Sequence, residues 1–106
     1  MAPENNDNKE LTNLLLVSGN KGSKEDSKEY VKRLSNAVLQ VFYKHDSVLL
    51  RCVGAAAVNN AMKACIIAKG EAQKKGDRLV IDPSFTTVNF KGEEKTGIVM
   101  EITAIE

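Results

Sequence analysis

The sequence of 106 residues lacks tryptophan and contains only two cysteines, two prolines and one histidine. Two isolated cysteines and a single His45 provide no spacing typical of a zinc site, and both Cys52 and Cys65 lie in apolar runs. We therefore predict buried thiols, with no metal and no cofactor. Aromatic residues make up 5% of the chain, so few side chains are available for stacking on the bases of single-stranded nucleic acid.

Long apolar segments and a large net charge are also absent. No apolar run approaches the roughly 20 residues that a membrane span requires, so we expect no membrane partner. The first ten residues, MAPENNDNKE, lack the basic start and apolar core of a secretion signal, and we expect a cytoplasmic protein with reduced cysteines. A formal net charge of +1 argues against a protein that coats nucleic acid by bulk charge alone.

The composition of the chain, with 42% hydrophobic and 27% charged residues, is typical of one soluble domain. Residues 1–10 carry three acids against Lys9, and we expect this polar leader to be disordered. Residues 11–106 are long enough to bury a core and are expected to form a single domain.

Apolar periodicity predicts the order strand, helix, strand, helix, strand, strand. Residues 11–17 and 47–54 are short apolar runs typical of buried strands. Between them, apolar residues recur at three- and four-residue spacing from Val31 to Phe42, which predicts an amphipathic helix. Strands joined through a helix indicate a parallel pair. Pro83 breaks the later strand region and should mark an edge, a bulge or a short excursion.

The stretch GAAAVNNAMKACIIAKG, residues 54–70, predicts a helix that is apolar or small on nearly every side. A helix of this kind has two faces to bury. We expect one face to cover the sheet and an alanine stripe to pack against the same helix of a second subunit. The alternative is that both helices lie on one face of the sheet and the alanines accommodate their crossing. The stripe consists of Ala57, Ala61, Ala64 and Ala68.

Three segments offer groups that could bind an anion. The loop SGNKGSKED follows the first strand, and its glycines can turn backbone amides outward near the positive end of a helix. The start of the second helix carries two asparagines, which could contact a phosphate or a base or could cap the helix. The hairpin FKGEEKT places two lysines beside two acids. The side chains concerned are Lys21, Lys24, Asn59, Asn60, Lys91 and Lys95.

No arrangement typical of an enzyme is recognisable in the sequence. A catalytic site needs a nucleophile with a base, a carboxylate pair in a cleft, or a metal cluster. Asp82 and Glu101 could meet across strands, but carboxylates of this sort are usually solvent-exposed. We therefore expect a protein without catalytic activity.

The segments VGAAAVNNAMKACIIAKG and IDPSFTTVNFKGEEKTGIVMEI resemble the bacterial stage V sporulation protein S family, which belongs to the Alba-like superfamily of small nucleic-acid-binding proteins. The resemblance covers residues 47–105. It implies an α+β fold, a two-layer βαβαββ sandwich with two helices on one face of a four-stranded mixed sheet, and a homodimer. It also implies binding of DNA or RNA through the three segments above. In this chain these supply Lys21 and Lys24, then Asn59, Asn60 and Lys63, then Lys91 and Lys95.

The departures from the Alba pattern limit what the resemblance implies. Archaeal Alba proteins have arginines just before the second helix, whereas this chain has Gly54, Ala55 and Ala56 there. The hairpin is short and half acidic, so strong coating of chromatin is not expected. Two hypotheses stand: a dimeric nucleic-acid-binding protein with a role in developmental regulation, and a module that binds protein partners in a regulatory or sporulation pathway without binding nucleic acid.

Overall fold

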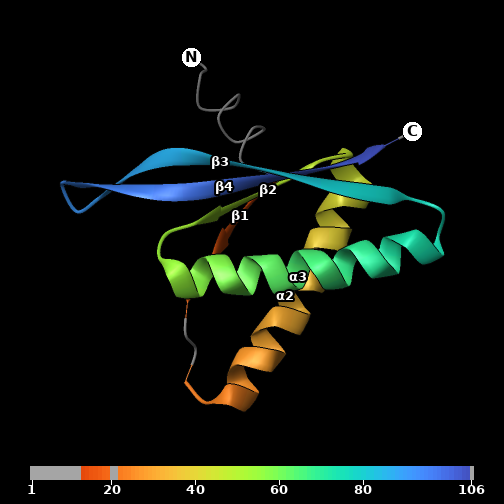
Figure 1. The fold of residues 1–106 in the computed structure, drawn as a ribbon, viewed down its shortest axis with the longest axis horizontal. Helices are drawn as coiled ribbons and strands as arrows, with labels where there is room; N and C mark the ends of the chain where they lie inside the picture. The colour runs from red at the N-terminus through yellow and green to blue at the C-terminus, as the bar shows by residue number, and fades with distance from the viewer. Residues whose placement is uncertain (1–12, 20–21, 106) are drawn as a thin grey trace.

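The computed structural model describes residues 13–19 and 22–105, so the predicted leader lies outside the described residues. The described part contains β1 (Leu14–Val17), α2 (Lys24–His45), β2 (Val48–Cys52), α3 (Ala55–Lys74), β3 (Arg78–Phe90) and β4 (Glu93–Ile105). The strand order is β1-β2-β4-β3, with β1 parallel to β2 and the other pairs antiparallel. Both helices lie on one face of the sheet (Figure 1), which confirms the predicted two-layer α+β architecture.

Helix α2 begins at a complete capping box. The Ser23 side chain accepts a hydrogen bond from the Asp26 backbone N–H at 3.1 Å, and the Asp26 carboxylate accepts one from the Ser23 backbone N–H at 3.3 Å. This satisfies two of the amides that a helix start leaves without partners. The helix turns its apolar residues toward the sheet and α3, and those buried are Val31, Leu34, Val38 and Phe42.

The core lies between the helices and the inner face of the sheet. Alternate residues of β2 and β4 oppose one another across the ladder, with Leu50 beside Met100 and Val48 beside Ile102. Each of these four side chains is at most 1% exposed. Side chains alternate between the two faces of a strand, so the intervening residues face away from the helices.

The alanine stripe lies inside this core, which corrects the predicted role of the stripe. Ala57, Ala61, Ala64 and Ala68 are each at most 1% exposed within one protomer. A second subunit cannot reach them, so they are not a dimer interface. They let α3 approach α2 and the sheet closely, which is the alternative that the sequence left open.

Strand β3 runs through Pro83 without the predicted break. Its residues pair continuously with β4, and Pro83 stands beside Met100. Because β3 is an edge strand, it needs ladder donors on one side only, and an edge is where a sheet tolerates proline. The expectation that Pro83 marks an edge is therefore confirmed.

Candidate nucleic-acid interface

The three predicted binding segments lie at one end of the molecule. β1 and β2 are parallel, so the loops that follow them leave the sheet at the same end. The turn between β3 and β4 extends beyond that end, because Cys52 at the end of β2 pairs with Ile98 and β4 runs from there back toward the turn. Figure 1 shows the turn and the start of α3 on this side of the molecule. The fold thus brings together segments far apart in the sequence.

Asn60 fixes the loop after β1 to α3. Its amide nitrogen donates hydrogen bonds to the carbonyl oxygens of Ser18 at 3.0 Å and Gly19 at 2.9 Å, and the residue is 6% exposed. An amide nitrogen has two hydrogens, and both are used inside the protomer. The prediction that Asn60 contacts nucleic acid is therefore corrected, because its buried amide positions a loop.

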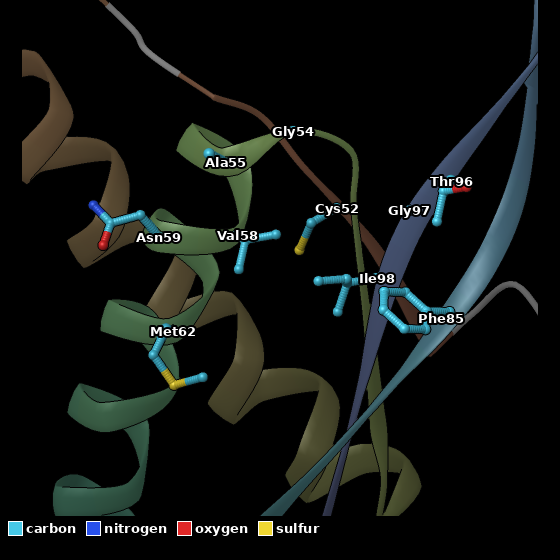
Figure 2. Close-up of a pocket in the computed structure, with 10 residues that line it drawn as sticks. All are labelled: Cys52, Gly54, Ala55, Val58, Asn59, Met62, Phe85, Thr96, Gly97 and Ile98. Carbon is cyan, nitrogen blue, oxygen red and sulfur yellow. The ribbon is translucent and has the colours of Figure 1, made fainter.

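Asn59 and the start of α3 face the exterior. The Asn59 side chain is exposed and points away from the cavity beside it (Figure 2). Gly54 is the N-cap residue, no side chain caps the helix, and the first turn contains no acid. The first turn of α3 therefore keeps its partial positive charge, although Gly19 of the loop after β1 lies close to Ala56 and the Ala57 amide. Nothing lies within 4 Å of where a Gly54 Cβ would stand, so an anion can approach closely.

Lys24 and Lys63 lie on either side of a groove between the two helices, together with Lys28. All three lysines are exposed. The groove has a volume of about 450 Å³. Lys28 is not among the predicted site residues, although its spacing of four residues from Lys24 places both on one helix face. We call this the helix groove, lined by Lys24, Ser27, Lys28, Val31, Asn60, Lys63, Ile66 and Ile67.

Two lysines lie at the hairpin, where Lys91 and Gly92 form a tight turn. Both turn residues have positive φ, 53° and 80°, as a two-residue type I′ turn requires. Lys95 lies beside Arg51 in a shallow cavity of about 330 Å³ on the outer face of the sheet. Arg51 was missed because only the β2–β4 pairing brings it to the hairpin. Glu93 lies 4.0 Å from the Lys95 ammonium and partly offsets its charge.

The predicted cations therefore gather in two places. Lys24 and Lys63 face the helix groove, whereas Lys95 lies on the outer face of the sheet beside Arg51, which was not predicted. Lys21 lies outside the described residues. No single described groove contains the whole predicted set, and a ligand that contacted both places would have to follow the end of the molecule around the sheet edge.

A separate apolar cavity of about 550 Å³ lies between α3 and the half of the β3–β4 hairpin that is nearer the turn. Figure 2 shows Val58 and Met62 of α3 on one side and Phe85 and Ile98 of the strands on the other. Phe85 is 81% exposed and Met62 is 39% exposed. Exposed apolar side chains that border one hollow are typical of an interaction surface.

The cysteine thiols are buried and protonated. Burial raises the pKa of the Cys52 thiol, and burial together with the nearby Cys52 raises the pKa of Cys65 from 9.0 to about 12. Neither thiol is therefore a nucleophile at neutral pH. Among residues 13–19 and 22–105, no group of histidine, cysteine and acidic side chains is placed to hold a metal ion. Over the same residues, no helix combines the length and apolar character that crossing a membrane requires.

Comparison with known proteins identifies a family and a similar fold. The family model described as Stage V sporulation protein S matches residues 24–105. Among solved structures, Alba from Thermoplasma volcanium is similar in fold, with a TM-score of 0.51 and 16% sequence identity. The similarity covers 89% of this chain and 100% of that chain.

Proposed function

Because the chain belongs to the stage V sporulation protein S family and has an Alba-like fold, we propose that it is a dimeric, non-catalytic nucleic-acid-binding protein. It acts in the cytoplasm and contacts the phosphate backbone of DNA or RNA. The observation that carries the proposal is the convergence of three predicted segments at one end, where exposed cations lie near the start of α3, which has no side-chain cap. Contacts of this kind give affinity without reading the base sequence.

The proposed contact set draws on the start of α3, the hairpin and the loop after β1. Helix α3 contributes its first amides and Asn59, and the hairpin contributes Lys91 and Lys95 with Arg51 beside them. The set also keeps Lys24, Lys63 and Lys21, and it omits Asn60 because the amide of that residue is occupied.

A salt series tests nucleic-acid binding. A protein that neutralises about three to five phosphates on duplex DNA should show a log–log salt slope of about −2.7 to −4.5. Its affinity should therefore fall about 40- to 500-fold between about 50 and 200 mM salt. Fluorescence anisotropy with labelled DNA and RNA measures both quantities. Absent or salt-insensitive binding would refute the proposal and favour the protein-interaction module.

Charge reversals locate the contacts. Lys91→Glu combined with Lys95→Glu should weaken binding strongly. It should also make the log–log salt slope shallower by about 1.8, which corresponds to two phosphate contacts. The matched control is Lys44→Glu combined with Arg78→Glu. These exposed cations lie at the end of α2 and the start of β3, away from the hairpin (Figure 1). Both pairs change the net charge equally, so an equal loss would show that bulk charge alone governs binding.

The dimer is proposed through the cavity between α3 and the hairpin, because the alanine stripe is unavailable. Phe85 and Met62 expose apolar surface that a second copy of the chain would cover. Phe85→Ser should convert a dimer to a monomer in sedimentation at micromolar concentration while the circular dichroism spectrum is kept. Leu16→Ser is the control, since Leu16 is 64% exposed on the outer sheet face. A wild-type monomer at these concentrations would refute the dimer.

A further inference from the structure

The helix groove is lined by aliphatic side chains, which we call its floor, and by three lysines, which we call its rim. Ile66 and Ile67 are 61% and 41% exposed, although isoleucine is among the residues most often found inside proteins. Val31 continues the apolar lining on the α2 side, and the three lysines stand around it. An exposed apolar patch with a polar rim marks a surface that another molecule covers.

The charge of the groove selects the partner. None of its lining residues is acidic, whereas three are lysines. An acidic ligand is therefore complementary to the rim, and complementary charge both speeds association and disfavours other partners. The aliphatic floor adds a second requirement, because a ligand that offers only negative charge would leave the isoleucines uncovered.

Nucleic acid meets only the first requirement. Bases of single strands stack on aromatic side chains, and the groove lining contains none. The phosphates of a duplex contact cations and backbone amides, so a bound duplex would leave the two isoleucine side chains uncovered. A protein segment with carboxylates on one side and aliphatic side chains on the other meets both requirements.

Gly70 leaves room for a partner segment to lie close to α3. This glycine lies inside the helix, where it costs about 1 kcal/mol relative to alanine. No atom lies within 4 Å of where its Cβ would stand, so nothing in the described protomer requires a glycine there. It follows Ile66 and Ile67 by one helical turn and thus shares their face. A glycine at this place lets a second backbone approach closely.

We propose that the helix groove docks an acidic amphipathic helix of a protein partner. The aliphatic residues of that helix, spaced at i, i+3 or i+4 and i+7, pack on Ile66 and Ile67. Its carboxylates pair with Lys24, Lys28 and Lys63, and its backbone passes over Gly70. This is a binding activity separate from the proposed contact with nucleic acid, although Lys24 and Lys63 serve both.

A designed peptide tests the proposal. The probe is a fluorescein-labelled peptide of leucine, glutamate and alanine, roughly 18 residues long so that it can form a helix, with leucines on one face and glutamates on the other. One control peptide has the same composition in shuffled order, and a second has lysine in place of glutamate. Anisotropy should report micromolar binding of the probe and binding at least about tenfold weaker for both controls.

Variants of the protein place the peptide on the groove. Lys28→Glu should weaken probe binding about tenfold, whereas Lys32→Glu, one turn further along the same helix and outside the groove, should change it less than about twofold. Gly70→Ala should weaken binding severalfold while the melting temperature rises, so loss of folding cannot explain its effect.

The results separate this proposal from the proposed function. The Lys91→Glu, Lys95→Glu variant should lose affinity for duplex DNA and still bind the probe, whereas Lys28→Glu should weaken binding of the probe more than binding of duplex DNA. The proposal is overturned if the probe does not bind, or if Lys28→Glu and Lys32→Glu weaken it equally. It is also overturned if Lys28→Glu weakens duplex DNA as much as the probe, because the groove would then be a nucleic-acid surface. Failure of all nucleic-acid binding leaves the probe result valid.

Discussion

Replacing Asn60 by alanine should destabilise the fold, although the sequence pattern placed this residue in a binding site. The change removes two hydrogen bonds, from the amide nitrogen to the carbonyls of Ser18 and Gly19. Each contributes a net of about 0.5–1.5 kcal/mol, so the loss is about 1–3 kcal/mol. Unfolding entropy scales with chain length and is about 0.22 kcal/mol/K for 106 residues. The melting temperature should therefore fall by about 5–14 °C.

Asn59→Ala is the matched control. The Asn59 side chain is exposed and makes no hydrogen bond to another described residue, and Asn59 occupies the same helix one position earlier. Both variants gain the same helix propensity, at most about 0.7 kcal/mol, so the difference between their melting temperatures isolates the two hydrogen bonds.

Thermal unfolding followed by circular dichroism measures the difference between the two variants. Asn60→Asp should cost more than Asn60→Ala, because a carboxylate would face two carbonyl oxygens. The positioning role is refuted if the two variants have the same melting temperature and Asn60→Ala weakens only nucleic-acid binding. The contact role would then stand.

Further predictions concern packing, capping and the thiols. Gly97→Ala should destabilise by about 1–3 kcal/mol in urea unfolding, since its Cβ would lie 2.7 Å from the Cys52 carbonyl oxygen, whereas Gly70→Ala should stabilise by about 0.5–1 kcal/mol. Ser23→Ala should cost about 0.5–2 kcal/mol and speed hydrogen exchange in the first turn of α2. Cys65 should react with Ellman's reagent at pH 8 only when the protein is unfolded. Burial raises the pKa of Cys65 in the folded protein from 9.0 to about 12. The protonated thiol therefore contributes fully to the free energy of unfolding below pH 9, and this contribution is lost as the pH rises toward 12. Cys65→Ala should make stability less dependent on pH in this range.

Local signals predicted the elements and their order. Ser23 and Asp26 form their capping box within four residues of sequence, so no distant contact is needed to recognise it. The alternation of Ile98, Met100 and Ile102 likewise records which face of β4 is inward. Pro83 was correctly expected to allow an edge strand, but periodicity could not decide between an edge, a bulge and an excursion, because that choice depends on strand order.

The tertiary contacts of α3 could not be predicted in the same way. A helix with small residues on one side and large apolar residues on the other has two faces to bury, and periodicity does not tell which one the same chain covers. Here the alanines pack against α2 and the sheet, so the side chains of Met62, Ile66 and Ile67 remain exposed to solvent. The hydrogen bond from the Asn60 side chain to the Ser18 carbonyl joins residues 42 positions apart, and sequence periodicity could not predict it either.

The helix groove and the nucleic-acid surface share Lys24 and Lys63, so their proposed ligands cannot bind independently. One ammonium cannot neutralise a phosphate and a carboxylate fully at the same time, and each ligand must therefore weaken the other by the same factor. Salt acts unequally on the two, because phosphate contacts depend on counterion release, whereas a docked helix also buries aliphatic surface on Ile66 and Ile67. The peptide should thus displace nucleic acid more effectively as ionic strength rises. A partner that carries such a helix would release nucleic acid from this protein by occupying two of its cations, with no change in fold.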